Sequence, residues 1–99
     1  MYSIETRVKT ANASRYLLQL SKHWAHRMPV TFTPIEARIP FSETSVCLID
    51  ADIEGLDLRI EAPDPGEASR LGDVVLDHLR RFAFREGLEE PVWRLAPTG

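Results

Sequence analysis

Three histidines are the residues with the clearest chemical potential. His23 and His26 lie three positions apart, so a helix would present both on one side, and His78 lies far along the chain. Three converging imidazoles can bind zinc or iron. The spacing matches no specific zinc signature, however, and His23, His26 and Arg27 could simply complement the negative end of a helix dipole. We therefore expect no resident cofactor, with a zinc or iron site at the three histidines as the alternative.

Apart from these histidines, the sequence contains none of the catalytic constellations that short motifs reveal. It has no glycine-rich phosphate loop, no nucleophile elbow and no Cys-His pair. Cys47 is the only cysteine, so no internal disulfide can form, and its apolar surroundings predict a buried, unreactive thiol. His78 falls in an apolar helical stripe, where structural hydrogen bonds explain a histidine. We therefore expect a protein without catalytic activity.

Charge is distributed unevenly along the chain. Residues 6–35 contain no Asp or Glu but five Lys or Arg, whereas residues 36–78 contain eleven acids and three Lys or Arg. Five bases over this length are sparse for a nucleic-acid surface, so we expect no nucleic-acid partner. We expect a protein partner or self-association, with Lys22 and Arg27 among the contacts.

The periodicity of apolar residues predicts the elements that position these groups. Residues 2–9 alternate as a half-buried strand. Apolar residues at three- and four-residue steps then predict two amphipathic helices, the first ending near Arg27 and the second capped by Asp64 and terminated at Gly87. Short strands are predicted at 30–33 and 37–41.

A hairpin is predicted within residues 46–62. A two-residue turn at Glu54 and Gly55 would set its register and place Asp50 opposite Arg59 on the solvent face. The charge pairing and the apolar face agree in that register, so the hairpin is the best-specified local feature.

Three apolar residues have no obvious place in the core. Val46 and Leu48 fall on the face of the hairpin that should be solvated, and Trp93 lies in a segment with two prolines and no regular period. An apolar group on a polar face often marks a contact surface. We therefore expect Val46, Leu48 and Trp93 to take part in partner binding.

These elements predict an α+β fold. We expect a single domain over residues 1–99, a two-layer sandwich in which two helices cover one face of a mostly antiparallel five-stranded sheet, in the order β-α-β-β-β-β-α. Residues 88–99 should form an irregular tail that packs back. No apolar run approaches the length of a membrane span, and the start lacks a signal-peptide pattern, so we expect no membrane partner and a cytoplasmic location.

Several strings of residues resemble the bacterial domain of unknown function 2218 family, over nearly the whole chain. They are Ser14-Arg15-Tyr16-Leu17, Gln19-Leu20, Lys22-His23-Trp24 and His26 in the first helix, Ile39-Pro40-Phe41 and Cys47 in the strands, and His78-Leu79, Arg81-Phe82-Ala83-Phe84-Arg85-Glu86 and Trp93 near the end.

The resemblance implies an uncharacterised bacterial protein with no established activity and no catalytic residues to carry over. It also implies an association with genes for siderophore and iron handling, including flavin-dependent siderophore-interacting reductases. We therefore expect a non-catalytic accessory or protein-interaction module linked to siderophore or iron metabolism. A metal-binding protein that uses the helix histidines is the alternative.

Overall fold

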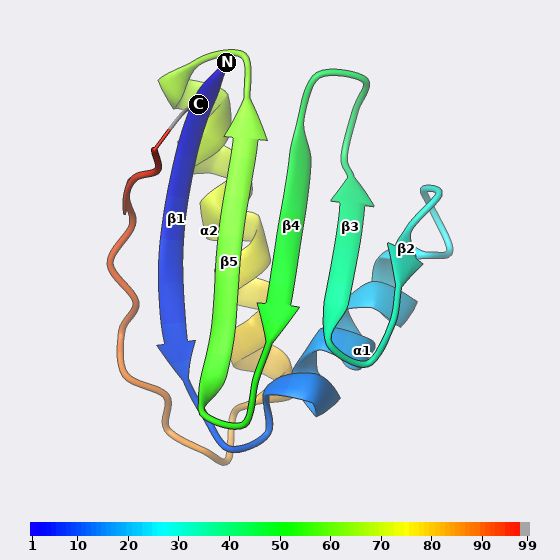
Figure 1. Ribbon diagram of the computed structural model, residues 1–99, viewed down its shortest axis with the longest axis vertical. Helices are drawn as coiled ribbons and strands as arrows, with labels where there is room; N and C mark the ends of the chain where they lie inside the picture. The colour runs from blue at the N-terminus through cyan, green and yellow to red at the C-terminus, as the bar shows by residue number, and fades with distance from the viewer. Residues whose placement is uncertain (98–99) are drawn as a thin grey trace.

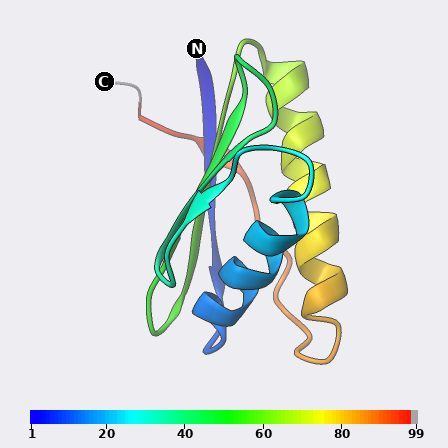
Figure 2. The ribbon, with the colours of Figure 1, turned by 90° about the vertical axis from the view of Figure 1, so that its right-hand side faces the viewer.

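The structure is a computed structural model that describes residues 1–97. Two helices lie on one face of an antiparallel sheet with strand order β2-β3-β4-β5-β1-β6, which confirms the predicted α+β class and helical layer (Figures 1 and 2). The elements are β1 (Tyr2–Lys9), α1 (Ala13–Trp24), β2 (Thr31–Phe32), β3 (Glu36–Pro40), β4 (Val46–Ala51), β5 (Gly55–Ala62), α2 (Pro65–Phe82) and β6 (Arg94–Leu95).

The core lies between the sheet and the helices. Alternate residues of the central strand β5 point inward, and Leu56, Leu58 and Ile60 are fully buried there. Leu20 of α1 and Leu79 of α2 meet them from the helical layer. Each such side chain contributes roughly 1.5–3 kcal/mol by leaving water, so the inner stripes of both helices are explained by packing.

The second helix begins as predicted and ends earlier. Asp64 accepts a hydrogen bond from the backbone N–H of Glu67 at 2.8 Å, which confirms the cap. The helix ends at Phe82, four residues before the predicted end, because the side chain of Glu86 is bound by residues of α1 and draws the chain off the helix axis. Gly87 adopts a positive φ of 64°, but it lies in the segment after the helix and does not terminate it.

The turn of the β4–β5 hairpin was predicted one residue too late. Ala51 pairs with Leu56, so the turn is centred on Ile53 and Glu54, and Asp50 lies opposite Asp57 and not opposite Arg59. Asp52 causes the shift, because its Oδ1 accepts the backbone N–H groups of Glu54 and Gly55 at 2.8 and 2.9 Å.

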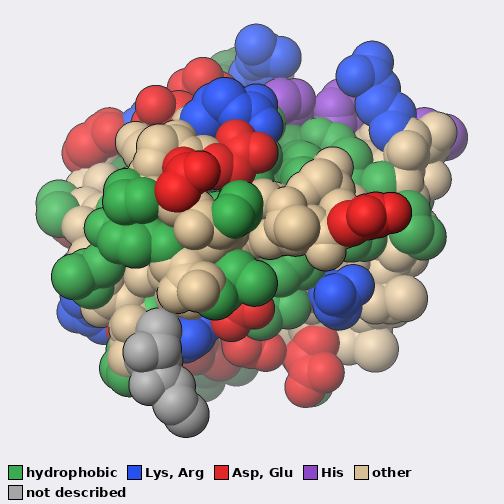
Figure 3. Space-filling view, turned by 90° about the horizontal axis from the view of Figure 1, so that it is seen from above, with side chains coloured by type: hydrophobic (Ala, Val, Ile, Leu, Met, Phe, Trp, Pro, Cys, Tyr) green, Lys and Arg blue, Asp and Glu red, His purple; other side chains and the backbone are tan. Residues whose placement is uncertain are grey.

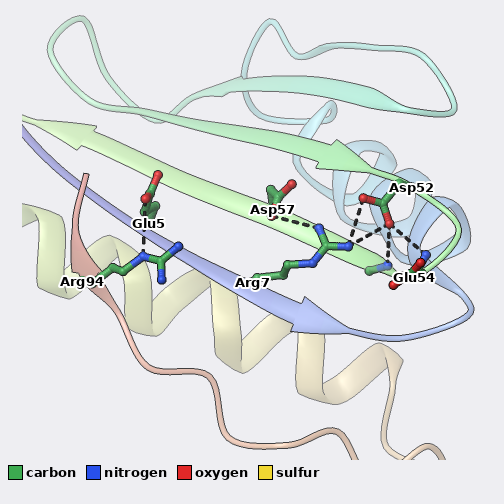
Figure 4. A network of polar contacts seen from close by, with 7 residues as sticks. Glu5, Arg7, Asp52, Glu54, Asp57 and Arg94 are labelled. Carbon is green, nitrogen blue, oxygen red and sulfur yellow. Dashed lines mark hydrogen bonds and ion pairs between the residues drawn. The ribbon is translucent and has the colours of Figure 1, made fainter. Parts of the chain in front are cut away.

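An arginine from β1 binds two acids of this hairpin, Asp52 in the turn and Asp57 on β5. Arg7 donates to both carboxylate oxygens of Asp52, at 2.9 and 3.0 Å, and to Asp57 at 3.0 Å (Figure 4). Asp52 and Asp57 are therefore both paired with an arginine from a neighbouring strand.

The glycine of this hairpin is required by space and not by its backbone angles. Gly55 does not have a positive φ. A Cβ at this position would lie 2.4 Å from the carbonyl oxygen of Val8 on β1. Real Cβ atoms essentially never come so close to another heavy atom. The start of β5 can therefore pair with the end of β1 only with glycine at this position.

The C-terminal segment forms a sixth strand, which corrects the prediction of five strands and an irregular tail. Arg94 pairs with Glu5 and Leu95 with Ile4, so β6 covers the outer edge of β1 (Figure 1). A two-residue strand leaves no periodicity to detect in the sequence. It forms because an open β1 edge would leave backbone groups unpaired.

The described part of the predicted tail, residues 88–97, contacts β1 and α2, and residues 98–99 lie outside the described residues. Trp93 lies against Gly72 of α2, where an added Cβ would be 3.0 Å from Trp93 Cε2. The hydroxyl of Thr6 donates to the carbonyl of Val92 at 2.9 Å. Neither helix of the described residues 1–97 is long and apolar enough to cross a membrane.

Candidate functional site

Two of the three histidines lie together between the helices. The ring centroids of His23 on α1 and His78 on α2 are 4.9 Å apart, and Trp24 lies 4.8 Å from the His78 ring. His78 Nδ1 is 2.8 Å from the carbonyl oxygen of Val74. Because a carbonyl can only accept, Nδ1 carries the proton in this contact, and Nε2 remains as the other ring nitrogen.

The described chain does not complete a metal site around this pair. Within residues 1–97, no group of three or more His, Cys, Asp or Glu side chains could hold a metal ion. Desolvation lowers the pKa of His23, and the nearby positive charges of His78, Arg27, His26 and Arg81 lower it further. The zinc or iron site predicted from the sequence therefore stays a prediction, since the structure shows two close imidazoles and not three.

An exposed basic cluster lies at the end of α1, formed by Lys22, His23, His26 and Arg27. The chain turns directly after the helix, where the backbone N–H of Arg27 donates to the carbonyl of Trp24. Figure 3 shows the histidine side chains along one edge of the molecule with Lys and Arg side chains beside them. None of these four residues forms an ion pair within residues 1–97.

A groove of about 600 Å³ lies between the first half of α1 and the end of α2. We call it the arginine groove, because Arg15, Arg81 and Arg85 line it. The guanidinium carbon of Arg85 lies 5.3 Å from the centre of the Phe84 ring. The remaining lining residues are Asn12, Tyr16, Gln19, Phe82, Phe84 and Glu86.

The only carboxylate lining this groove is already bound. Glu86 Oε1 accepts the Tyr16 hydroxyl at 2.6 Å and the Asn12 amide at 3.1 Å. Hydrogen bonds from the side chains of Thr10 and Tyr16 lower the pKa of Glu86. Burial, followed by the hydrogen bond to Glu86, raises the pKa of Tyr16. Glu86 therefore stays a carboxylate and Tyr16 stays a neutral phenol over a wide pH range.

Replacing Tyr16 by Phe should lower the free energy of unfolding by about 1 kcal/mol, the usual value of one hydrogen bond. The pKa of Glu86 is lowered by folding, so its contribution is present above the unfolded value of about 4.3 and disappears as pH falls through the folded pKa. The pKa of Tyr16 is raised, so its contribution is lost above pH about 10.

Urea denaturation of Tyr16→Phe at several pH values checks this. The loss should be constant from pH about 6 to 9 and shrink below pH about 4. Tyr2→Phe is the matched control, since the Tyr2 hydroxyl forms no hydrogen bond with residues 1–97. A loss of equal size at pH 3 would contradict the account.

The outer sheet face carries the two apolar residues noted in the sequence. Val46 lies opposite Glu61 and Leu48 opposite Arg59, and both apolar side chains are half-buried. Ion pairs surround them: Arg59 with Glu61 at 3.2 Å, and Arg94 with Glu5 at 3.4 Å (Figure 4). Arg59 and Arg94 are thus paired on this face, whereas Lys22 and Arg27 of the basic cluster form no ion pair within residues 1–97.

The structure places the predicted partner-binding residues in three separate regions. Lys22 and Arg27 lie in the basic cluster, Val46 and Leu48 lie on the outer sheet face, and Trp93 packs against α2. They do not form one surface. Two arginines of the groove, Arg81 in the last turn of α2 and Arg85 after it, were not singled out in the sequence.

The Cys47 thiol is fully buried. Burial raises the pKa of the Cys47 thiol to about 12, so the thiolate is scarce at neutral pH. This agrees with the unreactive thiol expected from the sequence.

Comparisons with known proteins agree with the fold. The model of a family described as "Uncharacterized protein conserved in bacteria (DUF2218)" matches residues 5–94. The NMR structure of PA4090 from Pseudomonas aeruginosa is 34% identical, with 95% of this chain and 96% of that chain covered and a TM-score of 0.81. No curated protein matches the sequence. The chain therefore belongs to the bacterial DUF2218 family.

Proposed function

We propose that this protein is a non-catalytic accessory module that binds the acidic surface of a protein partner through the basic cluster. The observation that carries the proposal is the positive charge of Lys22 and Arg27, which are exposed beside His23 and His26 and form no ion pair in residues 1–97. Positive groups that the fold does not neutralise favour a negatively charged surface and speed its association.

The outer sheet face supports a second copy or a partner less well. Three of its arginines, Arg7, Arg59 and Arg94, are already paired with carboxylates, and surface ion pairs contribute little to binding. We therefore assign the docking surface to the helical layer.

The partner we propose belongs to siderophore or iron handling in the cytoplasm, with a flavin-dependent siderophore-interacting reductase as the leading candidate. This part of the proposal rests on the resemblance of the sequence to its family. A free, buried Cys47 fits a reducing compartment.

Charge reversal tests the docking surface. Lys22→Glu with Arg27→Glu changes the cluster, and Arg38→Glu with Arg70→Glu changes the net charge equally at exposed sites elsewhere. Tagged proteins would be fixed with formaldehyde in the source bacterium, purified, and their bound proteins quantified by mass spectrometry. Thermal unfolding of both variants confirms folding.

We expect at least one protein that is retained by the control variant and depleted at least about tenfold by the cluster variant, which corresponds to about 1.4 kcal/mol. Its cross-linked peptide should be rich in Asp and Glu. Equal depletion by both variants, or a second copy of this chain as the only bound protein, would overturn the proposal. A partner with no role in iron uptake would remove the iron link alone.

A further inference from the structure

The arginine groove has an excess of positive charge that the fold does not neutralise. Arg15, Arg81 and Arg85 form no ion pair with any carboxylate in residues 1–97. The arginines elsewhere on α2 behave differently, since Arg70 pairs with Glu67 and Arg80 with Asp77. Of the arginines in α2, the one without an ion pair is Arg81, and it lines the groove together with Arg85 of the turn that follows.

The single carboxylate in the groove does not balance these arginines. One oxygen of Glu86 is shared by Tyr16 and Asn12, which together hold the carboxylate against the start of α1. Three guanidinium groups therefore face one negative charge that is already hydrogen-bonded. Like charges in one groove repel one another, and a bound anion removes that repulsion.

The guanidinium groups that line the groove favour oxyanions over simple halides. A guanidinium group presents several N–H donors in a planar fork, which matches the oxygens of a phosphoryl or carboxylate group. Gln19 and Tyr16 add polar groups to the wall from α1, and Phe82 adds an apolar surface from α2. A volume of about 600 Å³ lies within the usual range for small-molecule sites.

We propose that the arginine groove binds a small multivalent oxyanion, held by Arg15 of α1, Arg81 of α2 and Arg85 of the turn after α2. The ligand class is a small molecule with a phosphoryl group or with paired carboxylates. This site goes beyond the proposed partner docking, which uses the basic cluster at the other end of α1.

Pyrophosphate and citrate are the two probes, titrated at constant ionic strength while ¹H–¹⁵N NMR spectra of the whole chain are recorded. We expect saturable shifts at the arginine side chains of the groove with a Kd below about 1 mM for at least one probe. Sodium chloride at matched ionic strength should leave these signals in place. Saturation with neither probe up to about 10 mM would overturn the proposal.

Single substitutions distinguish specific hydrogen bonding by a guanidinium group from nonspecific attraction by positive charge. Arg81→Gln should weaken binding about tenfold, the effect of losing one charge-assisted hydrogen bond, and Arg81→Lys should recover only part of it. Arg80→Gln is the matched control, because Arg80 is the preceding residue and already pairs with Asp77. Equal weakening by Arg80→Gln and Arg81→Gln would contradict a specific site.

A variant of the basic cluster distinguishes failure of the oxyanion site from failure of the proposed partner docking. Lys22→Glu with Arg27→Glu should leave the Kd for the oxyanion probe within about twofold while it depletes the protein partner. Loss of probe binding in that variant would show that the groove has no recognition of its own.

Discussion

Replacing Gly55 by Ala should lower the free energy of unfolding by about 3 kcal/mol, at the upper end of the usual cost of overpacking. The added Cβ would lie 2.4 Å from the carbonyl oxygen of Val8. That oxygen belongs to the backbone of β1, so relief requires two paired strands to move apart, and a side chain cannot simply rotate away. For a domain of this size, the loss corresponds to a fall of roughly 12–20 °C in Tm.

Gly66→Ala is the matched control for this substitution. Its Cβ would lie 3.4 Å from a side-chain oxygen of Asp64, an ordinary contact, in the first turn of a helix. It should be neutral or should stabilise the protein by up to about 1 kcal/mol, because alanine restricts the unfolded chain. Denaturation in urea measures both variants, and equal stability of the two would show that strand pairing at Gly55 is not tight.

Replacing Trp93 by Ala should cost about 2 kcal/mol. A buried Trp-to-Ala change costs about 3–5 kcal/mol, and Trp93 is half-buried against Gly72 of α2. The effect should be mainly on stability, since the ring holds the tail that bears β6. Val92→Ala, whose parent side chain is 77% exposed, is the matched control and should stay within about 0.5 kcal/mol of the parent.

The same variant tests the predicted partner role of Trp93. If the ring serves packing alone, Trp93→Ala studied below its Tm should retain the partner as well as the parent does. A protein that keeps its stability but loses its partner would instead support the role predicted from the sequence.

The elements with long apolar periods were predictable, and the errors concern short-range hydrogen bonds. The two helices and the hairpin strands followed from periodicity because their inner residues are all needed in the core. The hairpin register was wrong because Asp52 closes the turn with its side chain, whereas sequence rules weight the glycine. β6 was missed because two residues carry no period.

The functional surface was predictable only in part. Lys22 and Arg27 stood out because no acid lies near them in the sequence. Arg81 and Arg85 did not, since Asp73 and Asp77 precede them and suggested a balanced helix face. Arg85 lies in the turn after α2, and the packing of α1 against the end of α2 could not be known from spacing.

The central claim is that the partner docks on the helical layer and not on the outer sheet face. The most direct measurement places one photoreactive amino acid at Lys22 or at Leu48 and compares the cross-linked products in the source bacterium. We predict a discrete product with another protein from position 22 and none from position 48. A product from position 48 alone would contradict the account and assign function to the outer sheet face.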